Sequence, residues 1–131
     1  MVTRRRVLAT DGAVMMAAVG PAAAAGAERS EMYGLIGSMK AQPGQRDALS
    51  AILLENAHPL PGCLSYVVAG DPSDPDTVWV TEVWDSADSH RASLGLPAVQ
   101  DAIARAKPLL AGFGQRTETR PLGGHGLAPA T

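Results

Sequence analysis

The chain has 131 residues, 46% of them hydrophobic and 18% charged, with a formal net charge of −2. These values indicate one globular domain and argue against a disordered low-complexity chain. The single cysteine, Cys63, excludes a disulfide framework and a cysteine-rich zinc module, and the acidic balance disfavours nucleic-acid binding, so we expect small molecules and proteins as partners.

The first 27 residues are typical of an export signal. An arginine cluster at residues 4–6 precedes a weakly apolar stretch and an Ala-Gly-Ala cleavage pattern at residues 25–27. The run at residues 3–9 resembles the twin-arginine signal, which a receptor reads and which is not a membrane anchor. The apolar stretch 12–27 is shorter than the roughly 20 residues that a spanning helix needs. We expect residues 1–27 to be removed during export to the periplasm or the extracellular space, with no stable membrane anchor; an uncleaved tether is the alternative.

The rest of the chain is predicted to be one acidic domain. Residues 1–27 contain three arginines and one aspartate, so the remaining 104 residues carry a formal charge of −4. We expect residues 28–122 to form the domain and residues 123–131 to form a flexible tail. Within the domain, residues 31–40 are predicted as a strand that ends at the Pro43–Gly44 turn.

An amphipathic helix is predicted after this turn. Between Gln45 and Asn56, apolar residues recur at three- and four-residue spacing, at Leu49, Ile52 and Leu53. The prolines and the glycine at positions 59–62 end the helix.

A β-hairpin is predicted at residues 63–70 and 77–84, which are rich in β-branched and aromatic residues and are joined by turn-forming residues. Neither strand alternates cleanly, because residues 67–68 and 78–80 place apolar side chains on both faces. An antiparallel sheet commonly exposes one face to water. The pattern therefore predicts helices over one face and a second subunit over the other.

A second helical region and a last strand complete the predicted order. Residues 85–88 can cap a helix that contains His90, and Gly95 and Pro97 interrupt it before a second helical segment. Residues 112–122 are predicted as a polar edge strand. The buried stripe of the second segment is expected to comprise Leu96, Val99, Ile103, Ala106 and Leu110. The order β-α-β-β-α-β predicts an α+β, ferredoxin-like fold with two helices on one face of a four-stranded sheet.

Three motifs in this order resemble those of a known family. They are Pro43-Gly44 before the first helix, Pro61-Gly62-Cys63-x-x-Tyr66 at the second strand, and Glu82-x-Trp84-Asp85 followed by His90. Together they are similar to the antibiotic biosynthesis monooxygenase domains, also called the quinol monooxygenase-like group, over residues 33–121. The resemblance implies a dimeric α+β barrel with a pocket between each sheet and its own helices. The activities that the resemblance implies are cofactor-free oxygenation of quinols and anthrones, haem degradation and isomerisation, and the fold alone does not decide among them.

His90 is the candidate catalytic residue. It lies about one turn into the capped helix, whose positive end disfavours imidazolium and leaves a neutral ring that can accept a proton. The resemblance to the family adds to this interpretation. The alternative is an ordinary surface residue of a helix.

Four aromatic residues, Tyr33, Tyr66, Trp79 and Trp84, are candidate walls for a flat aromatic ligand, with packing in the core or at a subunit interface as the alternative. Strand alternation places Trp79 and Trp84 on opposite faces of the third strand, so at most one of them can line the helix-side pocket. Alternation alone leaves open which one does.

Two further polar residues of the hairpin have expected structural roles. Glu82 lies among apolar strand residues and would be costly to bury unpaired. We expect Arg116 or Arg120 of the last strand to pair with it, with proton transfer as the alternative role. Cys63 is expected to be a small buried hydrophobe.

No cofactor or metal site is predicted. The three histidines are scattered, and neither a His-x-x-x-His nor a Cys-x-x-Cys pattern occurs in the sequence. No glycine-rich phosphate loop precedes a helix. Asp71, Asp74 and Asp76 could hold calcium, but the interleaved prolines favour a rigid turn.

The sequence leaves two hypotheses for the function. The first is a cofactor-independent monooxygenase that acts with O2 on a quinol, an anthrone or a similar electron-rich aromatic, with His90 as the base. The second is an exported, non-catalytic dimer that binds a small aromatic ligand, which the low aromatic content of 4% favours. Haem degradation is disfavoured, because the first strand has no asparagine and Ala92 and Ala102 stand where relatives with that activity carry Trp and His.

Overall fold

The structure is a computed structural model that describes residues 31–55 and 60–127. The predicted export signal lies outside the described residues, as does the end of the predicted tail. The elements are β1 (Tyr33–Ala41), α2 (Arg46–Leu54), β2 (Cys63–Gly70), β3 (Thr77–Trp84), α3 (Ala87–Ser93), α4 (Pro97–Ala106), the short 3-10 helix η2 (Lys107–Leu109) and β4 (Leu110–Thr119).

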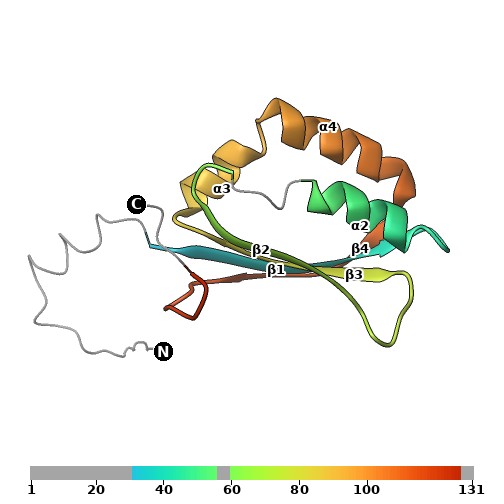
Figure 1. Cartoon of the computed structure of the whole chain (residues 1–131), viewed down its shortest axis with the longest axis horizontal. Coiled ribbons are helices and arrows are strands. Elements are labelled where there is room, and N and C mark those ends of the chain that lie inside the picture. Colours follow the sequence, from blue (N-terminus) through green and yellow to red (C-terminus); the bar gives the residue numbers. More distant parts are fainter. Residues whose placement is uncertain (1–30, 56–59, 128–131) are drawn as a thin grey trace, which may run out of the picture. The chain divides into compact units, whose positions relative to one another are not determined.

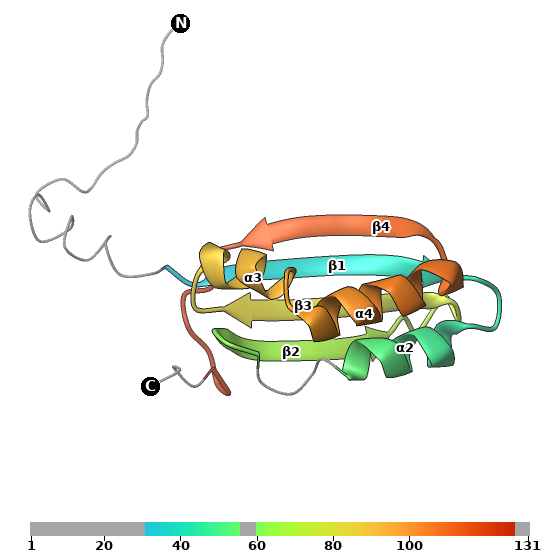
Figure 2. The same ribbon diagram turned by 90° about the horizontal axis from the view of Figure 1, so that it is seen from above.

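The four strands form one antiparallel sheet in the order β2-β3-β1-β4. Figure 1 shows all described helices on the same face of this sheet, and Figure 2 shows α4 running across the middle of that face with α2 beside it. The predicted ferredoxin-like α+β fold is confirmed, and β4 lies at an edge of the sheet as the sequence indicated.

The core lies between the sheet and the helices. Leu49 of α2 and Val78 of β3 have no exposed surface, and Trp84 is 1% exposed. Ala41 of β1 and Ala106 of α4 belong to the same buried cluster. Alternation along β3 explains this arrangement, because Val78 and Trp84 belong to the set of residues that points to the helices.

The buried residues of α4 differ from the predicted stripe. Val99 and Ala106 are buried as expected, but Ile103 is 42% exposed and Ala102 is buried in its place. Leu96 and Leu110 are only half-buried, and Leu110 belongs to β4. Ala102 and Ile103 both border the cavity described below.

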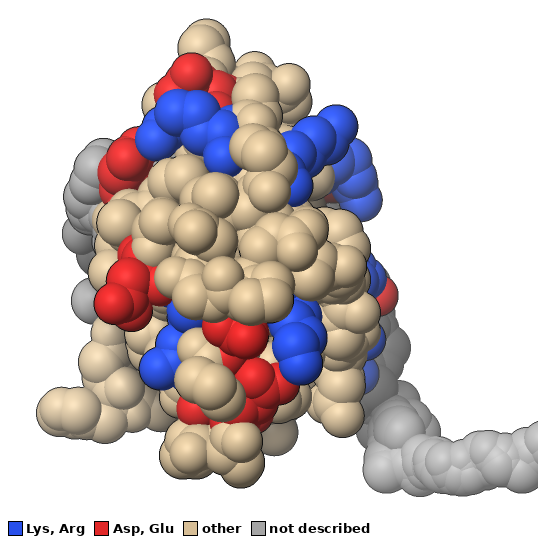
Figure 3. Space-filling model, turned by 90° about the vertical axis from the view of Figure 1, so that its right-hand side faces the viewer, with Lys and Arg blue, Asp and Glu red and all other residues tan. Residues whose placement is uncertain are grey.

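The loop between β2 and β3 is organised by one arginine of α2. Arg46 Nη1 donates hydrogen bonds to the carbonyl oxygens of Asp71, Asp74 and Thr77 at 3.2, 3.0 and 3.3 Å. Lys40 Nζ also donates to Asp74 Oδ2 at 3.0 Å. Figure 3 shows acidic and basic side chains interleaved over this end of the domain. The acidic loop is therefore a structural feature held by arginine and lysine.

Among the described residues, no helix combines the length and the apolar character needed to cross a membrane.

Candidate active site

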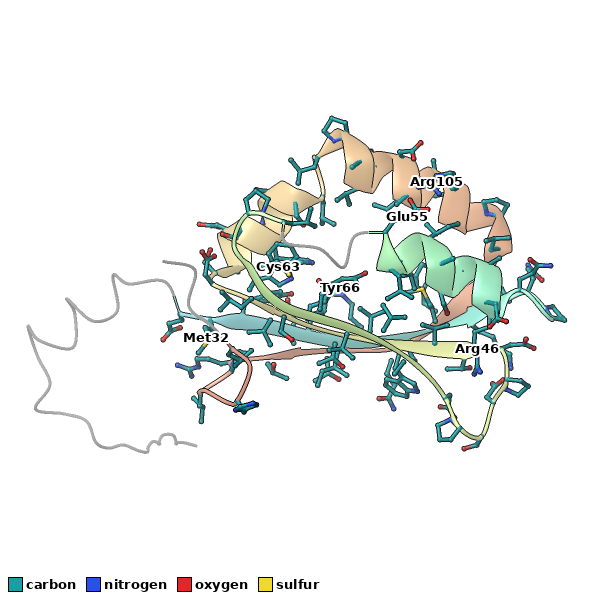
Figure 4. The ribbon with its side chains drawn as sticks, in the orientation of Figure 1. Met32, Arg46, Glu55, Cys63, Tyr66 and Arg105 are labelled. Carbon is teal, nitrogen blue, oxygen red and sulfur yellow. The ribbon has the colours of Figure 1, made fainter. Side chains whose placement is uncertain are left out.

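A cavity of about 630 Å³ lies between the sheet and the helices. Its walls are largely apolar, with side chains from β1, α2, α4 and β4. Figure 4 shows Tyr66 pointing from β2 into the space between the sheet and the helices. The polar or ionisable residues that line the cavity are Tyr66, Glu82, His90, Ser93, Lys107 and Arg116. An apolar cavity with a few polar groups is typical of a site for a small organic ligand.

Three side chains form a connected group in the wall of the cavity. Trp84 Nε1 donates a hydrogen bond to Glu82 Oε1 at 2.9 Å, and the same oxygen lies 3.9 Å from His90 Nε2. The side chains of His90 and Glu82 are only 14% and 15% exposed. The Trp84 ring meets the His90 ring edge to face, with 5.5 Å between their centroids. The imidazole is thus held beside a carboxylate that can stabilise a positive charge on it.

Local structure explains how His90 reaches the cavity. Ser86 caps α3 by accepting a hydrogen bond from the backbone N–H of Ser89 at 3.1 Å, so the helix begins directly after β3. Ser93 Oγ donates to the carbonyl oxygen of His90 at 2.6 Å. Because α3 has only seven residues and His90 belongs to its last turn, the predicted influence of the positive helix end carries little weight here. Glu82 supplies the charge next to the imidazole instead.

Tyr33 also packs against the imidazole. Its ring lies 5.2 Å from that of His90, and its hydroxyl donates a hydrogen bond to Glu118 Oε2 at 2.6 Å. Partial burial and this carboxylate raise the pKa of Tyr33 above its usual value. Tyr66 of β2 stands opposite Glu82 of β3. Burial and the Glu82 carboxylate raise the pKa of Tyr66 strongly. Both phenols are therefore neutral hydrogen-bonding groups at physiological pH.

The comparisons with known proteins agree with this architecture. The family described as antibiotic biosynthesis monooxygenase matches residues 32–105, more than half of the chain. This chain belongs to the antibiotic biosynthesis monooxygenase family. Among curated proteins, none matches it.

Solved structures place the chain within this family's fold. A Chloroflexus aurantiacus protein assigned to the family is 66% identical, with a TM-score of 0.72 over 74% of this chain and 99% of that chain. One from Deinococcus radiodurans is 27% identical, with a TM-score of 0.61 over 70% of this chain and 94% of that chain. SnoaB, a cofactor-independent oxygenase from Streptomyces nogalater, is 11% identical, with a TM-score of 0.61 over 73% of this chain and 98% of that chain, and shares the fold.

The antibiotic biosynthesis monooxygenase fold separates the predicted aromatic residues. Tyr66 and Trp84 line the cavity together with His90, and Tyr33 supports the imidazole. Trp79 lies on the opposite face of the sheet, where its Nε1 donates to Asp71 Oδ2 at 2.8 Å. Only one tryptophan of β3 therefore belongs to the cavity.

The predicted partner of Glu82 is wrong. Arg116 lies 3.8 Å from Glu118, and Arg120 pairs with Glu31 at 3.1 Å, so neither arginine pairs with Glu82. The physical reason is the strand order: β1 separates β3 from β4, which leaves two strand spacings between the backbones. Glu82 instead has Trp84 and His90 as neighbours.

Sequence reasoning did not identify Arg116 as a residue of the cavity. Arg116 lies on β4, which has a β-bulge where Gly114 and Gln115 both stand opposite Ser38 of β1. The extra residue shifts the alternation, so that Phe113 and Arg116 both face the helices. The glycines at 112 and 114 were the available signal, because glycine inside a strand often marks a bulge.

The remaining candidates for special chemistry have ordinary surroundings. Cys63 is half-buried, and its Sγ lies 3.6 Å from the carbonyl oxygen of Ser65; burial raises the pKa of this thiol and makes it less reactive. The described part of the chain contains no group of three or more His, Cys, Asp and Glu side chains arranged to hold a metal ion.

Proposed function

We propose that this family member is a cofactor-independent monooxygenase that acts on a quinol, an anthrone or a similar electron-rich aromatic. The observation that carries the proposal is the position of the His90–Glu82 pair in the wall of a largely apolar cavity. The fold shared with the cofactor-independent oxygenase SnoaB supports the reaction class. Cavity size and apolar walls suit a flat ligand of two or three fused rings.

In this mechanism His90 takes a proton from the bound substrate. The carboxylate of Glu82, 3.9 Å from Nε2, stabilises the imidazolium that forms. The electron-rich substrate anion then reduces O2 in surroundings with little water. For an anthrone, the ring CH2 loses two hydrogens and becomes C=O, while one oxygen atom of O2 enters the product and the other leaves as water. O2 accepts all four electrons, so this balance requires no further reductant.

Oxygen consumption tests the proposal directly. The full chain, treated with a chelator, is mixed with 1,8-dihydroxyanthrone or 1,4-dihydroxynaphthalene under ¹⁸O2. We expect O2 uptake above the rate without protein, and one labelled oxygen atom per product molecule. Thermal stabilisation by either compound without uptake would instead favour the non-catalytic ligand-binding dimer.

We propose that the protein is a homodimer joined through the helix-free face of the sheet. In the described domain the helices lie on one face, and the other face presents Ile36, Trp79 and Val83 together with Val67, which is 53% exposed. Apolar side chains on an uncovered sheet face favour association with a second copy. Light scattering should report a dimer for the wild type and a monomer for Val67→Arg; a monomeric wild type would contradict the proposal.

We also propose that residues 1–27 direct export through the twin-arginine pathway. The arginine cluster and the cleavage pattern support this proposal. Cell fractionation should find the mature protein outside the cytoplasm, and changing residues 4–6 to lysine should retain it inside. Equal export of both forms would contradict it.

A further inference from the structure

The cavity differs in charge from the chain as a whole. The chain carries a formal charge of −2, whereas the ionised groups that line the cavity are two cations, Arg116 and Lys107, and one anion, Glu82. Since Glu82 already faces Trp84 and His90, the two cations are the charges available to a ligand. A cavity with a net positive lining favours an anionic ligand.

The fold contains a specific device that directs Arg116 into the cavity. Ser38 is 7% exposed, and its Oγ accepts a hydrogen bond from the backbone N–H of Gln115 at 2.9 Å. A Cβ added at Gly114 would lie 2.3 Å from the same Oγ, so a larger residue at this position would displace the Ser38 hydroxyl from its hydrogen bond. With the bulge, Arg116 stands opposite Gly37 and faces the helices. Without it, regular alternation from Phe113 would turn residue 116 to the other face.

The cavity floor carries no side chain at Gly37, beside Arg116. Glu82 stands opposite Leu35, two residues along β1 from Gly37, the neighbour of Arg116. Two strand spacings across and two residues along correspond to about 12 Å between the backbones of Glu82 and Arg116. A Cβ added at Gly37 would meet only the carbonyl oxygen of Gln115 within 4 Å, at 3.4 Å. A flat fused ring can therefore span from His90 to Arg116.

The ion pair between Arg116 and Glu118 is long and exposed. Arg116 Nη1 lies 3.8 Å from Glu118 Oε2, which is too long for a hydrogen bond, and both side chains are more than half exposed. That carboxylate oxygen already accepts the hydroxyl of Tyr33. By contrast, Arg105 is bound by both Glu55 and Asp101. The guanidinium of Arg116 can therefore exchange its distant partner for a carboxylate of a ligand, which it can bind through two N–H groups.

We infer that the cavity is selective for hydroxylated aromatic acids, and that Arg116 is the specificity-determining residue. Arg116 binds the carboxylate, while the ring lies over Gly37 and directs its ionisable hydroxyl to His90. This inference rests on the proposed function in assigning the reacting end of the ligand to His90. Binding of an acid at Arg116 is otherwise independent of turnover.

Calorimetry with two redox-stable probes tests this inference. 6-Hydroxy-2-naphthoate, whose hydroxyl and carboxylate lie at opposite ends of the ring system, and 2-naphthol differ by one carboxylate, and both are titrated into the full chain at neutral pH. We expect the acid to bind about tenfold or more tightly than the naphthol, because a charge-assisted bidentate contact is added. Arg116→Gln should abolish this preference and leave the affinity for 2-naphthol unchanged. The control Arg120→Gln removes the same charge from a residue paired with Glu31 and should retain the preference.

Several results would overturn the inference. For the wild type, these are equal affinity for both probes or no binding of either. For the variants, they are an unchanged preference in folded Arg116→Gln, or loss of the preference in Lys107→Gln but not in Arg116→Gln. Oxygen uptake with 1,4-dihydroxynaphthalene keeps the two proposals distinguishable. Uptake without a preference for the acid would support the oxygenase proposal and overturn the inferred selectivity. A preference without uptake would support the selectivity for aromatic acids and contradict the oxygenase proposal.

Discussion

The two tryptophans of β3 make the same hydrogen bond in two different regions. Trp79 donates to Asp71 at 2.8 Å in the hairpin loop, and Trp84 donates to Glu82 at 2.9 Å in the cavity wall. Asp71 also accepts the backbone N–H of Ser73 at the surface, whereas the Glu82 side chain is only 15% exposed and lies beside His90. The same tryptophan–carboxylate pair is therefore structural in the loop, but in the cavity wall it lies beside a group that can exchange a proton.

The largest expected difference between the two regions is in the free energy of unfolding when each tryptophan is replaced by alanine. Trp84→Ala deletes a side chain that is 1% exposed, and we expect a loss of about 3–5 kcal/mol in the free energy of unfolding. Trp79→Ala, at a half-buried position on the other face, should cost less than half as much. Urea denaturation at two protein concentrations measures both effects and separates any contribution of subunit association. Equal losses would contradict the assignment of Trp84 to the core.

Arg46→Lys tests whether the hairpin loop is structural. Lysine cannot reproduce the hydrogen bonds from one guanidinium nitrogen to three carbonyl oxygens, so we expect a loss of about 1–3 kcal/mol. Arg91→Lys, in an exposed ion pair within α3, is the matched control and should cost less than about 0.5 kcal/mol. Similar melting curves for both variants would show that the loop does not depend on Arg46.

Neutralising Glu82 in the cavity wall should lower the rate of O2 uptake, whereas neutralising Asp71 in the hairpin loop should not. Glu82→Gln keeps an oxygen acceptor for Trp84 but removes the charge beside His90, so we expect about a tenfold lower rate of O2 uptake. Asp71→Asn changes the equivalent group in the loop and should leave the rate unchanged. A wild-type rate in folded Glu82→Gln would remove Glu82 from the mechanism.

The smallest expected effect is on acid stability. Hydrogen bonds from the backbone N–H of Asp76 and from Lys40 and Thr77 lower the pKa of Asp74 from 3.8 to about 2. A lowered pKa in the folded state stabilises the protein above the unfolded value, and this stabilisation is lost as the pH falls from about 4 to about 2. Asp74→Asn should therefore show a shallower loss of stability over this range. An identical pH profile would contradict the assigned role of Asp74.

Much of the fold followed from local sequence patterns. The hairpin boundaries at residues 63–70 and 77–84 were predicted correctly, because β-branched runs around a loop of Asp and Pro residues are strong signals. Opposite orientations of Trp79 and Trp84 followed from alternation. Which of the two faces the helices depends on tertiary packing, so alternation could not decide it.

The candidate site was less accessible to sequence reasoning. His90 was identified from its capped helix and from the family resemblance, but the contact with Glu82 depends on how α3 folds back beside β3. Arg116 was missed as a cavity residue because the bulge opposite Ser38 interrupts the alternation of β4. Local patterns determine which way a regular strand faces, whereas bulges and contacts between elements depend on the assembled sheet.

His90→Gln tests whether His90 is the base of the oxygenation reaction. Oxygen uptake with 1,4-dihydroxynaphthalene is measured for the wild type, His90→Gln and the control His125→Gln, whose histidine is exposed and does not line the cavity. We expect at least about a hundredfold lower rate for His90→Gln with a retained circular dichroism spectrum, and a wild-type rate for the control. Full turnover in folded His90→Gln would contradict the account.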